Sequence, residues 1–367
     1  MTISRREILL AAGAGSLASA LLTGSRAAQA ADGAGGMLMI DALGGTAVDE
    51  QGKADWLKSG VTMLETTLGA RGKPTFSYEA AVRDIASWHG TFTRMPNWLI
   101  HVKSTEDIME ANRSGKLGVM LGFQNGTHLQ RNLDNVEFFY NLGIRQIQLT
   151  YNTVNSLGAG CAARNDVGLT HFGVQVVQKM NELGMIIDLS HTGKRTGLDT
   201  IEQSEKPVLF THSNCQALCD NPRCKSDEEI KALAARGGVM GMTTVNFFVS
   251  KKPRSTAEDF FSHIDHAIDL VGVDHVGIGS DSLVSGWRAM VPTEEAFWQA
   301  HKDFLDVDFQ PEVDVRWPPY IEELDVPEKM WLIAEGLDKR GYSQDDIAKI
   351  MGQNFFRVYQ EIMDPAT

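Results

Sequence analysis

Short apolar runs alternate with amphipathic segments over most of this 367-residue chain. Strands that are apolar along their whole length are typical of a parallel sheet covered by helices on both faces. Eight such runs are present, which is the number of strands that closes a parallel sheet into a barrel. They are residues 37–40, 98–102, 117–122, 144–149, 185–191, 207–212, 239–243 and 275–279. The sequence therefore predicts an α/β fold, a (β/α)8 TIM barrel.

Helix start signals lie between these runs. Ser104, Ser226 and Ser255 each open a polar, acidic stretch that leads into an apolar-periodic segment. A hydroxyl at the N-cap and a carboxylate three residues later can satisfy the free backbone N–H groups of the first helical turn. The segments at Ser104 and Ser255 resemble such capping boxes.

Two segments interrupt the alternation. Residues 285–325 are rich in Trp, Pro and acidic side chains, which indicates either an excursion over the barrel mouth or a plain surface insertion. Residues 343–363 predict a pair of helices packed on the outside. We expect a single domain over residues 31–367, with an insertion near 285–325.

The first 30 residues are a separate unit. Arg5 and Arg6 precede a weakly apolar stretch that ends in Ala28-Gln29-Ala30, the pattern of a twin-arginine export signal with its cleavage site. A membrane anchor is the competing interpretation, but glycine, serine and threonine dilute the apolar stretch. The signal predicts recognition by the twin-arginine export machinery, a periplasmic location and no stable membrane anchor.

The chain is acidic, with a formal net charge of −13. Nucleic acid and anionic membranes are therefore unsuitable partners. The four cysteines are Cys161, Cys215, Cys219 and Cys224. An oxidising periplasm would permit a disulfide among them, but their spacing does not decide which pair. It is not a recognised zinc spacing either.

Two histidines end successive predicted strands. His191 follows the run Met185–Leu189, and His212 ends the run that begins at Pro207. About 20 residues separate them, enough for one crossover helix, so both imidazoles should emerge at the same rim of the barrel. Asp281 follows the last run in the same way. Two imidazoles near a carboxylate suit a zinc ion.

Catalytic groups in such barrels come from the carboxyl ends of the strands. The residues at these ends are Asp41, Gln124, Tyr151, His191, His212, Asn246 and Asp281. They form the predicted site, with Asn246 and Gln124 on the substrate side. Most other histidines lie in helical or strand-interior contexts, where a solvated or hydrogen-bonded imidazole is the ordinary interpretation.

At these motifs the sequence resembles the membrane (renal) dipeptidase family of zinc peptidases, the amidohydrolase-like M19 group. The matching segments are Ile187-Asp188-Leu189-Ser190-His191, Thr211-His212-Ser213-Asn214, 274–281 and 352–358. The resemblance covers about residues 37–362. It implies a (β/α)8 barrel of the amidohydrolase type that holds two zinc ions bridged by a glutamate and hydrolyses dipeptides; such proteins are often homodimers.

Several roles follow from the resemblance, position by position. His191 and His212 match the histidines of the second metal. Arg223 matches the arginine that grips the substrate carboxylate, for which a guanidinium fork is suited. Asp281 matches the aspartate that handles the proton, since a carboxylate near a metal-bound water can accept it.

Other positions depart from the family pattern. Asp41-Ala42-Leu43-Gly44-Gly45 stands where the family has Asp-Gly-His-x-Asp, so both protein ligands of the first zinc are absent. Gln124 replaces the bridging glutamate, and a neutral amide cannot bridge two dications as a carboxylate does. Tyr151 replaces the histidine that stabilises the tetrahedral intermediate, and a phenol can donate that hydrogen bond. We therefore expect one zinc ion on His191 and His212, with Asp281, Asp41 or Cys215 as candidates for a third ligand.

Three functional hypotheses remain open from the sequence. In the first, the protein is a periplasmic hydrolase of a dipeptide or small amide with a free carboxylate; Asp281 is the acid/base, Arg223 the carboxylate clamp, and Tyr151 or Gln124 polarises the carbonyl. In the second, it is a dipeptidase-like protein without peptidase activity that binds or matures a small peptide-derived metabolite such as a siderophore precursor, for which the pyoverdine-maturation members of the family are a precedent. The third is another reaction on the same barrel, such as that of a lyase or lactonase.

Overall fold

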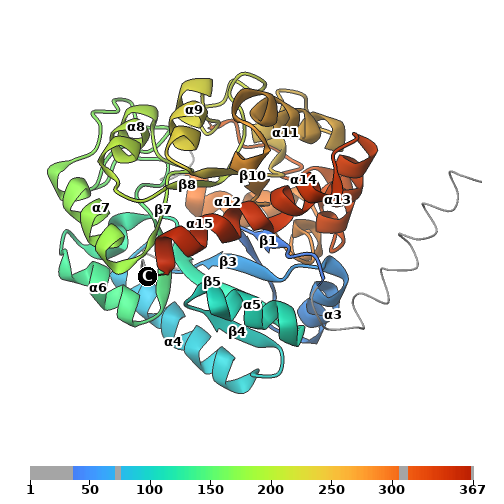
Figure 1. Ribbon diagram of the computed structural model, residues 1–367, viewed down its shortest axis with the longest axis horizontal. Helices are drawn as coiled ribbons and strands as arrows, with labels where there is room; N and C mark the ends of the chain where they lie inside the picture. The colour runs from blue at the N-terminus through green and yellow to red at the C-terminus, as the bar shows by residue number, and fades with distance from the viewer. Residues whose placement is uncertain (1–35, 71–75, 306–312, 365–367) are drawn as a thin grey trace, which may run out of the picture.

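The computed structural model describes residues 36–70, 76–305 and 313–364, so the predicted export signal lies outside the described residues (Figure 1). Eight parallel strands follow one another in the order β1-β3-β5-β6-β7-β8-β9-β10. Their bounds are β1 Ile40–Asp41, β3 Met63–Thr67, β5 Leu117–Phe123, β6 Ile144–Gln148, β7 Ile186–Asp188, β8 Leu209–Ser213, β9 Val239–Met242 and β10 Val276–Ile278. The Ala42 N–H donates to the Ile278 carbonyl at 3.0 Å and joins the first strand to the last. The predicted barrel is confirmed.

One strand differs from the prediction. The run 98–102 forms β4 (Leu99–Val102), which pairs with β5 but lies off the main strand order. The second barrel strand is instead β3, whose sequence Met63-Leu64-Glu65-Thr66-Thr67 is apolar only in its first half. Apolar periodicity missed it because the barrel buries the polar side chain of Glu65 in its interior.

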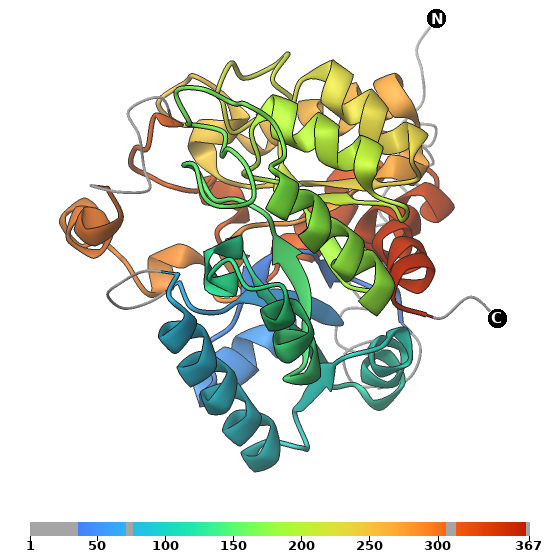
Figure 2. The same ribbon diagram turned by 90° about the vertical axis from the view of Figure 1, so that its left-hand side faces the viewer.

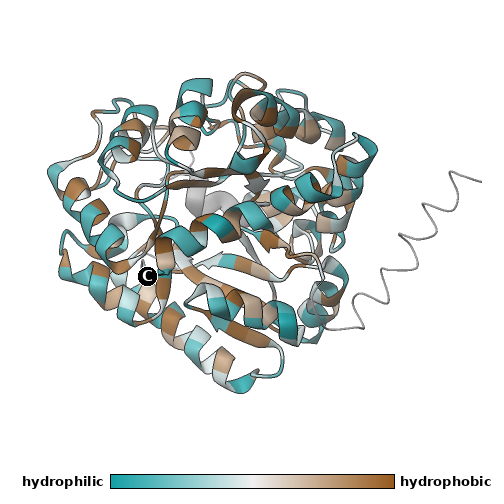
Figure 3. Ribbon diagram, viewed as in Figure 1, coloured by the Kyte–Doolittle hydropathy of each residue, from teal (hydrophilic) through white to brown (hydrophobic). Residues whose placement is uncertain are grey.

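Helices surround the strands, and their apolar faces turn toward the sheet while their polar faces point outward (Figure 3). Capping boxes begin the helices at Ser104, Ser226 and Thr256, so the third box starts one residue later than predicted. No described helix is long and apolar enough to span a bilayer. The bounds are α3 Glu50–Ser59, α4 Tyr78–Arg94, α5 Thr105–Ser114, α6 Asp134–Asn141, α7 His171–Leu183, α8 Lys194–Gln203, α9 Asp227–Ala235, α10 Asn246–Val249, α11 Ala257–Val271, α12 Glu294–Leu305, α13 Lys329–Lys339, α14 Gln344–Ala348 and α15 Asn354–Met363.

The last helix closes one end of the barrel. Figure 1 shows α15 lying across the strands, and its Phe355 and Tyr359 are buried against residues at the amino ends of the barrel strands, such as Met63. The prediction that residues 343–363 pack on the outside was wrong for this helix. Because α15 fills the amino end, the open end of the barrel is the carboxyl end.

The insertion lies toward that carboxyl end. It contains the 3-10 helix Trp287–Ala289 and α12, which lies on the opposite side of the molecule from α15 (Figure 2). The short strands β2 (Gly44–Gly45) and β11 (Ser282–Leu283) pair at its base. Residues of this segment therefore stand at the rim of the barrel.

We expect Gly279→Ala to lower the free energy of unfolding by about 2–3 kcal/mol, because overpacking a tight core forces the backbone apart. A Cβ atom at Gly279 would lie 1.8 Å from the Thr211 carbonyl oxygen. Urea unfolding of purified protein measures this. Gly197→Ala in α8 is the matched control, since its Cβ meets only Glu229 Oε1 at 3.9 Å and the change should be neutral or slightly stabilising. Equal stability of the Gly279 variant and the wild type would contradict the packing.

Candidate functional site

A cavity of about 720 Å³ opens at the carboxyl end of the barrel. Polar groups at its base include Gln124, Tyr151, Asn152, His191 and Asp281, all from segments that follow barrel strands. Its walls are rich in aromatic side chains. These are Phe76, Trp88, Tyr151, Phe247, Phe248, Trp287, Phe297 and Tyr320.

The two predicted histidines lie together. Their ring centroids are 5.2 Å apart, with the rings inclined at 56°. His191 follows β7 and His212 belongs to β8, and these parallel neighbours place both imidazoles at one end of the barrel. The pairing that the sequence predicted is therefore present in the structure.

One ring nitrogen of His191 makes a hydrogen bond, and the other makes none. Its Nδ1 lies 2.7 Å from Asn152 Oδ1, which can only accept, so Nδ1 carries the proton. Its Nε2 is buried and has no hydrogen-bond partner. The Tyr151 ring stacks on the imidazole at 4.1 Å and fixes its plane. A fixed tautomer with an unshared lone pair is the state in which a histidine binds a metal.

His212 is engaged at both nitrogens. Its Nδ1 lies 2.7 Å from Thr211 Oγ1, and its Nε2 lies 3.1 Å from the side-chain nitrogen of Gln124. The amide therefore donates to the nitrogen that would face a metal. Burial lowers the pKa of both His191 and His212 well below the ordinary value, and the positive charge of Arg223 adds to this. Both imidazoles are neutral near pH 7.

Asp281 lines the cavity. Burial raises the pKa of its carboxyl to about 7, although the charge of Arg223 opposes the shift. Its backbone has φ 56°, a left-handed conformation that few residues other than glycine adopt. The Tyr320 hydroxyl donates to its carbonyl. This unusual turn directs the chain from β10 into the rim strand β11.

Asp41 joins the first barrel strand to the segment after the last one. Its carboxylate accepts the Ser280 N–H at 2.7 Å and the Ser280 hydroxyl at 2.6 Å. These bonds tie the first strand to the segment after the last. Burial raises the pKa of Asp41 to about 6 despite the hydrogen bonds, which favour ionisation.

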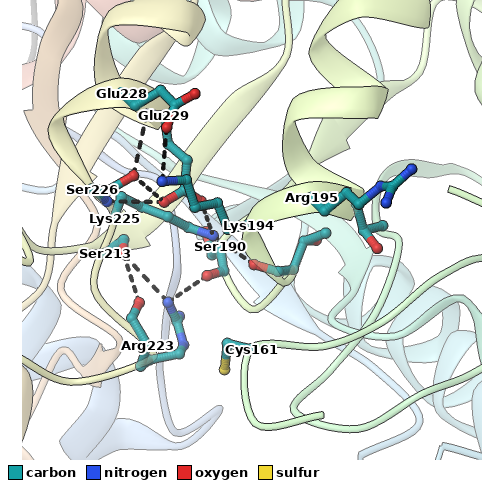
Figure 4. Close-up of polar contacts among 12 residues, drawn as sticks. Cys161, Ser190, Lys194, Arg195, Ser213, Arg223, Lys225, Ser226, Glu228 and Glu229 are labelled. Carbon is teal, nitrogen blue, oxygen red and sulfur yellow. Dashed lines mark hydrogen bonds and ion pairs between the residues drawn. The ribbon is translucent and has the colours of Figure 1, made fainter. Parts of the chain in front are cut away.

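Arg223 does not lie where the carboxylate clamp was expected. Its side chain is fully buried, with Nη1 donating to the Ser190 carbonyl at 2.6 Å and Nη2 to the His212 carbonyl at 2.8 Å. Figure 4 shows the guanidinium between Ser190 and Ser213. Because its terminal nitrogens bind the backbone behind the histidines, Arg223 positions the site instead of facing the cavity.

Asn246 also has another role than predicted. Its amide nitrogen donates to the carbonyls of Pro253 and Pro318, and its Oδ1 accepts the Ser255 N–H at 2.7 Å. The side chain is fully buried and fastens two loops together. The sequence suggested a substrate contact because Asn246 follows β9, but the side chain turns toward these loops.

Two buried side chains escaped the sequence prediction. Glu65 in β3 has one oxygen without a partner, and burial together with the charges of Asp188, Asp41 and Asp281 raises its pKa well above the ordinary value. Asn152 orients His191. Its position directly after Tyr151 was a usable signal, because a metal-binding histidine commonly donates its second N–H to an oxygen.

A (β/α)8 barrel with paired histidines and a carboxylate at the carboxyl ends of its strands has the architecture of the metal-dependent hydrolases. Residues 59–291 match the family model for membrane dipeptidases, peptidase family M19. The chain belongs to this family.

Individual relatives that match the chain are also named as dipeptidases. The chain is 32% identical over 212 residues to dipeptidase verJ of Clonostachys rogersoniana, covering 56% of this chain and 53% of that protein. It is 28% identical over 272 residues to the uncharacterised dipeptidase C965.12 of Schizosaccharomyces pombe, covering 72% and 58%. The chain thus spans little more than half the length of these relatives.

Solved structures match over nearly the whole chain. An amidohydrolase from Pseudomonas aeruginosa has a TM-score of 0.79 and 30% identity, covering 93% of this chain and 99% of that one. The probable dipeptidase PvdM from the same organism has a TM-score of 0.74 and 19% identity, covering 92% and 98%. At that identity the second likeness concerns the fold alone.

The family depends on metal ions, and the described residues offer fewer ligands than a two-metal centre needs. The lone pair at His191 Nε2 suits a ligand, whereas Gln124 blocks the corresponding nitrogen of His212. Within the described ranges no group of three His, Cys, Asp or Glu side chains is arranged to hold a metal. Among the candidates for a third ligand, Asp41 is bound to Ser280, and the Cys215 thiol donates to the His263 carbonyl. Only Asp281 lines the cavity.

The raised pKa of Asp41 predicts a pH dependence of stability. Since the unfolded pKa is about 4 and the folded one about 6, the folded state holds more protons between these values, and the free energy of unfolding falls as pH rises through this window. Asp41→Asn should remove roughly 2 kcal/mol of that fall between pH 4.5 and 7. Urea unfolding at pH 4.5 and 7 measures it. Asp220→Asn, at an exposed position, should leave the fall unchanged; an unchanged fall in the Asp41 variant would contradict the assignment.

Proposed function

We propose that the protein is a hydrolase of a dipeptide or other small amide and that its site holds one metal ion at most. The observation that carries the proposal is the pair of neutral imidazoles at 5.2 Å beside a cavity that Asp281 lines. His191 and His212 would hold the ion, which when bound polarises a carbonyl and acidifies a water. A catalytic zinc ion usually has three protein ligands, and Asp281, which lines the cavity, is the candidate for the third.

The chain's own residues supply proton handling and orientation. A carboxyl group with a pKa of about 7 is present in both protonation states at neutral pH, so Asp281 can accept a proton and return it. The Tyr151 phenol lines the same cavity and can donate to a substrate oxygen. Because Asn152 Oδ1 accepts the proton of His191 Nδ1, the lone pair of His191 lies on Nε2, at the other side of the ring.

The substrate carboxylate is not assigned to Arg223, since that guanidinium is buried among backbone carbonyls. Aromatic rings form much of the cavity wall instead. We infer that apolar contact with these rings provides much of the binding energy, and that a substrate with an aliphatic or aromatic side chain is preferred.

A second candidate is binding or maturation of a peptide-derived metabolite, such as a siderophore precursor, without peptide cleavage. The bond from the Gln124 amide to His212 Nε2 favours it, because that bond must break before His212 can bind a metal. Export to the periplasm by the twin-arginine machinery and a homodimeric state remain proposals from the sequence and the family resemblance.

We expect Asp281→Asn to lower kcat/KM for dipeptide hydrolysis by about 10²–10⁴-fold, the usual contribution of general acid–base catalysis. A panel of dipeptides with aliphatic and aromatic side chains, assayed by amine release with zinc added, measures this. Asp84→Asn is the matched control, because Asp84 also lines the cavity but accepts the Gly69 N–H at 3.0 Å; its kcat/KM should stay within about threefold. Dipeptides that bind but remain intact with the wild type would support the second candidate and contradict the first.

A further inference from the structure

The loop after β8 brings two of the four cysteines together. The Cys219 and Cys224 side chains are directed at two consecutive backbone carbonyls, those of Phe247 and Phe248. A tight turn brings them close, because the Asn221 N–H donates to the Cys219 carbonyl at 2.7 Å and the Cys224 N–H donates to the Asn221 carbonyl at 2.9 Å. Sequence spacing left the pairing open, whereas the turn brings one particular pair to neighbouring positions.

The surroundings of the two sulfur atoms match. Cys219 Sγ lies 3.7 Å from the Phe247 carbonyl, and Cys224 Sγ lies 3.2 Å from the carbonyl of the next residue, Phe248. Each carbonyl also accepts an amide N–H, from Asn221 at 3.1 Å and from Asn214 at 3.2 Å respectively. Loss of both S–H donors would therefore leave no buried carbonyl unsatisfied.

The other two thiols face elsewhere. Cys161 Sγ donates to Asn152 Oδ1 at 3.4 Å, and Cys215 Sγ donates to the His263 carbonyl at 3.5 Å. All four cysteines lie within the described residues, where each is a free thiol. The shared turn and the consecutive carbonyl partners thus single out Cys219 and Cys224.

We propose that Cys219 and Cys224 form an intramolecular disulfide that fastens the turn behind the site. The oxidant is a low-molecular-weight or protein disulfide. One cysteine thiolate attacks it and releases the first thiol; the second cysteine thiolate then attacks the mixed disulfide and releases the other thiol. Two S–H bonds are lost, one S–S bond forms, and the oxidant is reduced to two thiols.

The disulfide would restrain the positions of the residues between the two cysteines, Asn221 and Arg223 among them. Arg223 directly precedes Cys224, and its guanidinium binds the Ser190 and His212 carbonyls. The side-chain amide of Asn221 donates to the Val313 carbonyl at 2.9 Å. Closing this ring restricts the unfolded chain, so oxidation should raise Tm by about 2–4 °C.

The test uses the full chain, purified under reducing conditions and then equilibrated with oxidised glutathione. Iodoacetamide labelling in denaturant counts the remaining thiols by intact mass. We expect a fall from the four thiols of the reduced chain to two. Trypsin cleaves after Arg223 and separates the two cysteines, so the disulfide should appear as a dipeptide of Cys224 and Lys225 linked to the peptide that ends at Arg223.

Serine variants identify the pair. Cys161→Ser and Cys215→Ser should each still lose two thiols on oxidation, whereas Cys219→Ser and Cys224→Ser should form no internal disulfide and lose at most one thiol, to a glutathione adduct that the missing partner cannot resolve. Four thiols in the oxidised wild type would overturn the proposal. A stable glutathione adduct on either cysteine of the wild type, or a linked peptide that joins another pair, would overturn it as well.

Discussion

The buried guanidinium of Arg223 is the interaction on which the geometry of the site depends most. Through one planar group it binds the Ser190 carbonyl, directly before His191, and the carbonyl of His212 itself. The ends of two neighbouring strands are thereby fixed to each other. Removing one side of a buried, charged hydrogen-bond network costs several kcal/mol, because the remaining groups lose their partners without regaining water. The same interaction occupies both terminal nitrogens of Arg223 and leaves its Nε without a hydrogen-bond partner.

Carboxyl groups inside the barrel add a second constraint. Glu65, Asp41, Asp188 and Asp281 are close enough to influence one another, and burial raises the pKa of each. Ionising all of them in a medium of low polarity would be costly, so each carboxyl holds its proton to a higher pH than an exposed one. Asp281 is the member of this group that lines the cavity, and under the proposed function its proton is the one exchanged in hydrolysis. The polar interior therefore links the stability of the barrel to its chemistry.

Sequence patterns identified the elements whose side chains follow simple periodicity, and the histidine and aspartate positions followed because strand ends in a barrel meet at one rim. The strand with Glu65 was missed, since a carboxyl group buried in the barrel interior breaks the apolar pattern. The orientations of Arg223 and Asn246 were also beyond the sequence. Asn246 follows a strand as expected and Arg223 was assigned by the family resemblance, but long-range contacts with backbone carbonyls decide where both side chains point.

The central claim is that one half of a two-metal centre remains, built on His191 and His212. Metal analysis of the purified full chain by inductively coupled plasma mass spectrometry, after equilibration with zinc and removal of excess ion, tests it most directly. The account predicts one zinc ion per chain, its loss in His191→Ala, and its retention in His275→Ala, whose imidazole binds the Gly238 carbonyl away from the cavity. No zinc or two zinc ions per wild-type chain, or an unchanged zinc content in the His191 variant, would contradict it.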